Sequence, residues 1–129
     1  MSKTDYCENK VLDHLNGKSA FAMPTAYVAL FTAAPSDAGG GTEVSGGSYA
    51  RVATSGATWA AASAGATSNA AAVTFPTASA SWGTVTHYAT FDAATSGNML
   101  RWAALTASKT IGSGDTASFA IGALQMTED

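Results

Sequence analysis

The first apolar positions of the chain follow a helical period. Cys7, Val11 and Leu15 are spaced four residues apart, and Leu12 lies beside them. This narrow apolar stripe predicts an amphipathic helix over residues 2–17. A short helix of this kind does not persist alone in water. We therefore expect its stripe to pack on the rest of the domain or on a neighbouring subunit.

Capping signals set the expected bounds of this helix. Ser2 and Asp5 form a passable capping box at its start. Gly17 stands just past its end, where the chain often adopts a left-handed conformation that glycine tolerates. We accordingly expect an N-terminal helix or arm at 1–18, followed by a single domain at 19–129.

Beyond the helix the period changes to that of β-strands. Residues Tyr27–Thr32 carry β-branched and aromatic side chains on both faces, which predicts a buried strand. Tyr49–Thr54 and Ala71–Phe75 predict two further strands, the second of which ends at Pro76. Residues 55–69 are nearly all small and predict one weak strand with loops.

The clearest element is a hairpin formed by Thr84–Phe91, a turn region at 92–98, and Met99–Thr106. After a Gly-rich turn at 112–115, Thr116–Met126 predicts one long closing strand. Strict alternation along the first strand of the hairpin places on one face Val85, His87, Ala89 and Phe91.

Short strands separated by Gly- and Pro-containing turns are typical of a β-sandwich or jelly roll. We therefore expect a mainly β fold, a β-sandwich of jelly-roll type with a short N-terminal helix. A single buried cluster between its two sheets is expected to contain Phe31, Phe75, Trp82, Phe91, Leu100 and Phe119.

Composition narrows the class of protein. The 129 residues include 29 Ala, 17 Thr, 14 Ser and 13 Gly, while charged residues make up only 12%. This balance excludes a coiled coil and a charge-driven disordered chain. A surface of small hydroxylated residues suits a structural protein better than an enzyme.

The charge and the cysteine content exclude several classes of binding partner and site. The net charge is −3 and the six basic residues are scattered, so there is no basic patch for nucleic acid. The most apolar stretch, residues 20–34, is interrupted by Pro24 and is too short to span a bilayer. Cys7 is the only cysteine, which excludes an intrachain disulfide and a multi-cysteine metal site. We expect neither a nucleic-acid nor a membrane partner.

The residues able to do chemistry are few and scattered. His14 and His87 titrate near neutrality, but no Ser, Cys or Asp is visibly placed to work with either. Cys7 lies on the apolar stripe, where a thiol behaves as a small hydrophobe. Asp37 and Glu43 flank a Gly-rich loop and form at most a weak Ca²⁺ site, because hard cations need several oxygen ligands at fixed spacing. A solvated loop is the simpler interpretation of this pair.

Three tryptophans leave two interpretations open. Trp59, Trp82 and Trp102 can serve the core or an interface, or they can belong to a carbohydrate-binding face that includes Arg101 and Tyr88. The core or interface interpretation is favoured, because the chain is poor in large aliphatic residues and its aromatic residues must supply most of the burial.

The sequence contains no convincing active site. No paired carboxylates stand at a spacing that suggests glycoside hydrolysis. Arg51 is expected to pair with Glu43 or with a neighbouring chain, as a surface ion pair of little energetic weight. We therefore predict no catalytic residue, no cofactor-binding residue and no metal ligand, and we expect that the protein is not an enzyme.

Several segments occur in an order that resembles a known family, namely Tyr27–Gly39, Glu43–Arg51, Asn69–Pro76, Trp82–Asp92 and Gly114–Thr116. Together they resemble the small virion proteins of tailed bacteriophages, which carry two labels, capsid decoration (cement) protein and tail-fibre protein. The resemblance covers residues 27–126 and implies a structural part of the virion, with no catalytic residues.

The resemblance leaves two positions on the virion open. A capsid decoration protein would bind the outside of the shell and bridge major capsid protein subunits, and it would also associate with itself, most simply as a dimer. This interpretation is favoured because one small domain leaves no room for both a fibre shaft and a tip. The alternative is a tail-fibre or tail-tip module that binds a host receptor or glycan.

Either position implies a virion protein made in the host cytoplasm, with the capsid surface as the first expectation. With so few charges, attachment should rest on apolar and backbone contacts rather than on salt bridges. The N-terminal helix and an open strand edge are the expected contact points.

Overall fold

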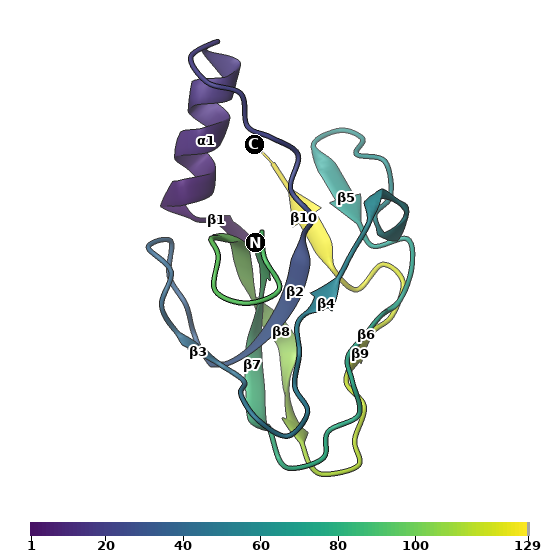
Figure 1. Cartoon of the computed structure of the whole chain (residues 1–129). Helices are drawn as coiled ribbons and strands as arrows, with labels where there is room; N and C mark the ends of the chain where they lie inside the picture. The colour runs from purple at the N-terminus through teal and green to yellow at the C-terminus, as the bar shows by residue number, and fades with distance from the viewer. Residues whose placement is uncertain (129) are drawn as a thin grey trace.

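Short strands separated by turns make up most of the chain (Figure 1). The computed structural model describes residues 1–128. Its elements, in chain order, are β1 (Ser2–Lys3), α1 (Asp5–Leu15), β2 (Tyr27–Ala33), β3 (Thr42–Glu43), β4 (Val52–Ala53), a 3₁₀ turn (Gly56–Thr58), β5 (Ala66–Ser68), β6 (Val73–Thr74), β7 (Gly83–Phe91), β8 (Met99–Ile111), β9 (Ser118–Phe119) and β10 (Gln125–Thr127).

Six strands form one antiparallel sheet in the order β1-β8-β7-β2-β3, with β4 also pairing with β2. Two small antiparallel sheets pair β10 with β5 and β6 with β9. The mainly β class with a short N-terminal helix is therefore confirmed. Within residues 1–128 the sheets do not include the two four-stranded sheets of a jelly roll. The domain predicted at 19–129 stays a prediction, and its last residue lies outside the described part.

The segments that lie opposite the large sheet are mostly loops, with β5, β6, β9 and β10 as their short strands. The strand predicted at 49–54 is reduced to β4, and the strand predicted at 71–75 is reduced to β6. The segment at 55–69 holds the 3₁₀ turn and β5, in line with one weak strand among loops. Ala- and Ser-rich segments offer few side chains that favour a pleated strand, so turns interrupt the pairing.

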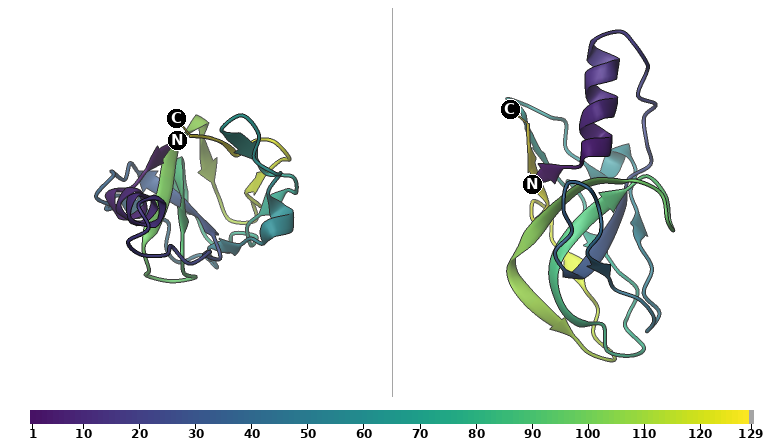
Figure 2. Two further views of the ribbon diagram at one scale, coloured as in Figure 1. Left: turned by 90° about the horizontal axis from the view of Figure 1, so that it is seen from above. Right: turned by 90° about the vertical axis from the view of Figure 1, so that its left-hand side faces the viewer.

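The main core lies between the large sheet and the segments opposite it, which are seen from above in Figure 2, left. Its buried side chains come from the sheet (Val28, Leu30, Val85, Tyr88, Ile111) and from the segments opposite (Val73, Phe75, Ala78, Trp82, Leu124).

A second, smaller cluster covers the other face of the large sheet and consists of Ala29, Phe31, Ala89, Phe91 and Met99. The expectation of a single cluster is therefore wrong. Adjacent residues of a strand point to opposite faces, so Val28 and Leu30 join the main core while Phe31 joins the second cluster. Leu100 is buried, at 7% exposure, but belongs to neither cluster.

The N-terminal helix begins later than its sequence predicts. Thr4, not Ser2, is the N-cap, and its hydroxyl oxygen accepts a hydrogen bond from the Cys7 backbone N–H. The residues before it extend as β1 and pair with β8, because strand pairing there satisfies backbone groups that a longer helix would leave at its end. Gly17 has φ +71°, as expected after a helix end.

Most of α1 stands clear of the β-structure (Figure 1; Figure 2, right). Of its predicted apolar stripe, Cys7 is buried and Val11 is half-buried. Leu12 and Leu15 are 57% and 75% exposed. The described chain thus covers only the first turns of the stripe.

The hairpin of β7 and β8 is present, but an irregular register changes which residues share a face. Val85 pairs with Lys109 and His87 with Ala104, so Thr86 alone on β7 stands opposite residues 105–108 on β8. A bulge of this kind reverses the alternation. Val85 therefore lies in the main core with Tyr88, whereas Ala89 and Phe91 lie in the second cluster. The predicted common face of Val85, His87, Ala89 and Phe91 is wrong for Val85.

The long strand predicted at 116–126 is also wrong. A turn separates β9 from β10, with the Ala123 backbone N–H donating to the Ala120 carbonyl and Gly122 at φ +81°. Because of this turn Ile121 is 70% exposed, whereas Leu124 is fully buried in the main core.

Candidate functional site

Polar side chains converge at a groove of about 580 Å³ on the second-cluster face of the large sheet. Its walls are the loop before β3, the start of α1 and the turn before β8, and the side chains of Phe31, Phe91 and Met99 line its apolar part. An ion pair that bonds to several loops lines this groove, so we describe it as the candidate site.

Two glycines shape the walls of the groove. Gly41 has φ +76°, and a Cβ atom there would lie 2.8 Å from the Pro35 backbone nitrogen. Gly97 has φ +74°, and a Cβ atom there would lie 2.6 Å from the Asp92 carboxylate. Both loops therefore close tightly only because these residues have no side chain.

Arg51 and Glu43 form a two-pronged ion pair beside the groove. Arg51 donates from Nε to Glu43 Oε2 at 2.9 Å and from Nη2 to Glu43 Oε1 at 2.8 Å. The side chain of Arg51 is only 7% exposed and that of Glu43 is 25% exposed. The pairing expected from the sequence is present within the chain. Its expected surface position is wrong, because the loops around it exclude water from the guanidinium group.

Arg51 also fastens the turn between β7 and β8. Its Nη1 donates to the carbonyl oxygens of Ala93 and Ser96, at 2.9 and 2.8 Å. Its guanidinium carbon lies 3.6 Å from the centre of the Phe91 ring, which is a cation–π arrangement. One side chain thus joins the β3–β4 region, the second cluster and the 92–98 turn.

Tyr49 completes the charged group from the side of the main core. Its hydroxyl donates to Glu43 Oε2 at 2.7 Å and accepts the Leu30 backbone N–H at 3.0 Å. Burial raises the pKa of the Tyr49 hydroxyl far above its usual value. Tyr49 therefore stays protonated and acts as a hydrogen-bond bridge between the groove and the core.

Asp37 joins the Gly-rich loop to the N-terminal segment. Its Oδ1 accepts hydrogen bonds from Ser2 Oγ at 2.6 Å and from Trp102 Nε1 at 2.9 Å. These bonds lower the pKa of the Asp37 carboxyl group, since they favour its charged form. The Asp37 backbone carbonyl also accepts the Asp5 N–H at 2.9 Å.

The charged side chains around the groove bond to other segments of the same chain and hold them together, so they act as a brace. Asp37 is bonded to Ser2 and Trp102, and Glu43 is bonded to Arg51 and Tyr49, so the two carboxylates that flank the Gly-rich loop have different protein partners. Among residues 1–128, no group of three or more His, Cys, Asp or Glu side chains is arranged to hold a metal ion.

The other chemistry candidates do not line this groove. His14 accepts the Phe21 backbone N–H at its Nδ1, 3.1 Å away, which fastens the segment after α1 to the helix. His87 lies 2.8 Å from the Thr86 hydroxyl through Nδ1. Cys7 is buried at 6% exposure, and burial raises the pKa of its thiol. A buried thiol of raised pKa is a poor nucleophile, in agreement with its interpretation as a small hydrophobe.

The tryptophans all bond to groups of their own chain. Trp82 Nε1 donates to the Gly47 carbonyl at 2.9 Å, and Trp59 Nε1 donates to the Thr54 hydroxyl at 3.1 Å. Trp82 is buried in the main core, and Trp59 packs against it. Together with the bond from Trp102 to Asp37, these contacts support the core interpretation.

The residues of the proposed carbohydrate face do not share a surface. Tyr88 is buried in the main core, at 6% exposure. Trp102 packs on the opposite side of the sheet, against the second cluster, and Arg101 forms an ion pair with Glu128. Adjacent residues on β8 necessarily point to opposite faces, so this trio offers no common platform.

Asn69 is a key polar residue that the sequence reasoning missed. It is 1% exposed, and its Nδ2 donates to the carbonyls of Ala71 and Ala120, both at 2.9 Å. Its Oδ1 accepts the Leu124 N–H at 2.9 Å. This side chain fixes the turn between β9 and β10, and its place at the head of the Asn69–Pro76 segment was the available signal.

The described part of the chain contains no helix that is long and apolar enough to cross a membrane. No curated protein matches the chain. A family model described as "Podophage GP4 fiber I protein gp80" matches residues 2–127, which include both core clusters and the Arg51–Glu43 brace. The chain therefore belongs to the family of podophage GP4 fiber I protein gp80.

Proposed function

We propose that this phage virion structural protein is a non-catalytic subunit of the tail fibre, held on the particle by apolar contacts. The family description, which names a fibre protein, is the observation that carries the proposal. The groove supports it, because its best-placed charged groups, Arg51 and Glu43, bond to each other and to loops of the chain. A capsid decoration protein that bridges major capsid protein subunits is the position that competes with this one.

The exposed end of α1 is the part of the molecule best suited to attachment. Leu12 and Leu15 project from it into solvent, and the segment after the helix runs along the side of Tyr6 and His14 instead. We infer that a neighbouring tail protein covers these two leucines. Apolar contacts of this kind persist when salt screens charges.

Point substitutions test this attachment better than truncation does. Removing residues 1–17 would also remove β1 and the Thr4 hydroxyl that donates to the Met99 carbonyl at 2.5 Å, so the fold itself would suffer. The variant Leu12→Ser/Leu15→Ser changes only exposed side chains. Ile121→Ser is the matched control, because Ile121 is equally exposed on a distant turn.

The assay is the amount of each variant per purified particle, measured by quantitative mass spectrometry. We expect the double variant to fall at least about tenfold, which corresponds to about 1.4 kcal/mol of lost attachment. Ile121→Ser should match the unchanged protein, and washing with about 1 M NaCl should release neither. Normal occupancy of the double variant, or release of the unchanged protein by salt, would contradict the proposed attachment.

A further inference from the structure

One edge of the large sheet is open along most of its length. On one side β8 pairs with β7 over Met99–Ala104 and again over Lys109–Ile111, whereas on the other side β1 pairs only with Trp102 and Arg101. In residues 1–128 no strand continues this pairing beyond Trp102, so residues 103–111 present an outer edge without a neighbouring strand. An open edge is a template for pairing with another polypeptide.

The hydrogen bond between Thr4 and β8 shows which backbone groups of β8 point toward the open edge, away from β7. The Thr4 N–H donates to the Leu100 carbonyl at 3.0 Å, so Leu100 directs its carbonyl toward the β1 side. Alternation along the strand then directs the N–H and C=O of Trp102 and Ala104 toward the same side. Trp102 is opposite Ser2, and Ala104 is the next residue whose N–H has no strand to receive it.

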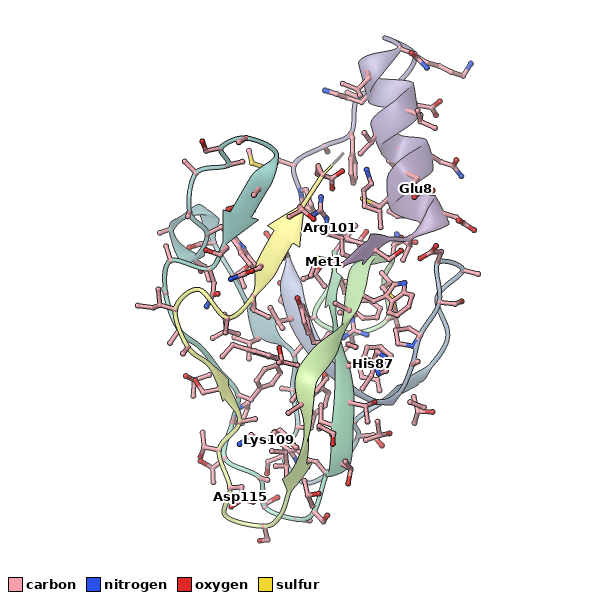
Figure 3. All side chains as sticks on the ribbon, turned by 180° about the vertical axis from the view of Figure 1, so that it is seen from behind. Met1, Glu8, His87, Arg101, Lys109 and Asp115 are labelled. Carbon is pink, nitrogen blue, oxygen red and sulfur yellow. The ribbon has the colours of Figure 1, made fainter. Side chains whose placement is uncertain are left out.

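A groove of about 660 Å³ follows this edge. β8 forms one wall and residues 118–125 form the other, with Met1 and Lys109 among the lining residues and labelled in Figure 3. The lining also includes Tyr88, Leu105 and Phe119. The groove therefore continues the line of β1 between the two layers of the fold.

The main core is incomplete where the groove runs. Met1, Leu105 and Phe119 pack against the core cluster but remain only partly buried. The Phe119 ring lies 5.4 Å from the ring of Tyr88, so an apolar side chain entering the groove would meet aromatic surface. Because the groove has a wall on each side, it fits one extended strand better than the edge of a second sheet.

We propose that this groove receives an extended segment of a different virion polypeptide, which adds to β8 as an edge strand in line with β1. Alternate side chains of the segment, small or apolar, face Tyr88, Leu105 and Phe119. An acidic residue of the segment lies near Lys109, which among residues 1–128 is the only charged side chain that lines the groove. The inference rests on the proposed virion function and adds a second contact to that of α1.

A second copy of this chain is the less suitable donor. The extended segment after α1 that carries the exposed Met23 is fixed to its own helix, through the Phe21 N–H bond to His14 and the contact of the Phe21 ring with Tyr6. The same segment contains Pro24, which cannot donate to a strand ladder.

Hydrogen–deuterium exchange of the unchanged protein tests this proposal, first free in solution and then in purified particles. The amides of residues 103–109 that face the open edge should exchange quickly in the free protein and at least tenfold more slowly in the particle. Equal exchange in both, with the protein present at normal occupancy, would overturn the proposal. Protection that appears in the free protein as its concentration rises would also overturn it, in favour of a second copy.

A pair of variants at one position gives an independent test. Ala104→Pro removes the outward N–H and is tolerated at a strand edge, whereas Ala104→Thr keeps the N–H. We expect particle occupancy to fall at least tenfold for Ala104→Pro and to stay normal for Ala104→Thr. Equal occupancy of the two folded variants would overturn the proposal, while complete absence of the unchanged protein from particles would refute the virion function on which it rests.

Discussion

Removing the Arg51 side chain should destabilise the fold far more than removing an exposed cation. Arg51→Ala takes away both donors to Glu43 and both bonds to the 92–98 turn, and it uncovers the Phe91 ring. Breaking a buried ion pair by deleting one partner costs about 3–5 kcal/mol. Because Glu43 keeps 25% of its side chain in water, we expect the lower end of this range, about 3 kcal/mol.

The measurement is the free energy of unfolding from urea denaturation at neutral pH. Arg51→Lys retains the charge but cannot form the two-pronged pair or the flat contact with Phe91, so it should lose about 1–2 kcal/mol. Lys109→Ala is the control, because Lys109 is exposed, and it should change stability by less than about 0.5 kcal/mol.

A double-mutant cycle isolates the pair itself. Arg51→Ala, Glu43→Ala and the double variant should give a coupling free energy above about 1 kcal/mol, since the two side chains share direct contacts. The reasoning is refuted if Arg51→Ala costs less than about 1 kcal/mol or if the two single losses simply add.

Two further substitutions test the core and its pH dependence. Leu124→Ala should cost about 3 kcal/mol, because Leu124 is fully buried, whereas Ile121→Ala, on an exposed residue of the same segment, should cost less than about 0.5 kcal/mol. If urea denaturation shows a larger loss for Ile121→Ala than for Leu124→Ala, the turn is refuted and the uninterrupted strand predicted at 116–126 is favoured. The raised pKa of Tyr49 contributes stability that is present below its unfolded pKa of about 10 and is lost as pH rises above it. Above pH 10 the free energy of unfolding of Tyr49→Phe should therefore fall less steeply with pH than that of the unchanged protein, by about 1.4 kcal/mol per pH unit. Equal slopes for the two proteins would contradict this.

The spacing of apolar residues is enough to predict the elements that depend mainly on residues close together in the sequence. The buried strand β2, the β7–β8 hairpin and the α1 helix all follow from the spacing of apolar residues. The sequence also predicts the Arg51–Glu43 pair, since Glu43 is one of the two partners expected for Arg51. Its burial did not, because the water around a side chain depends on loops that pack from distant parts of the chain.

Register and turns inside predicted strands were not predictable from alternation alone. The bulge opposite Thr86 depends on how many residues each strand contributes between two pairs, which one strand cannot reveal. The turn at Gly122 depends on Asn69, which stands far away in the sequence and bonds to both sides of it. Gly122 within an otherwise regular pattern was the one local signal of a break.

A density map of the intact phage particle tests the central claim most directly. The proposed function predicts density that fits the β-structure and projecting helix α1 at the tail fibre, with the end of α1 in contact with a neighbouring tail protein. Density of this shape repeated across the capsid shell would contradict the tail-fibre position and favour a decoration protein. Its absence from the whole particle would contradict a structural role in the virion.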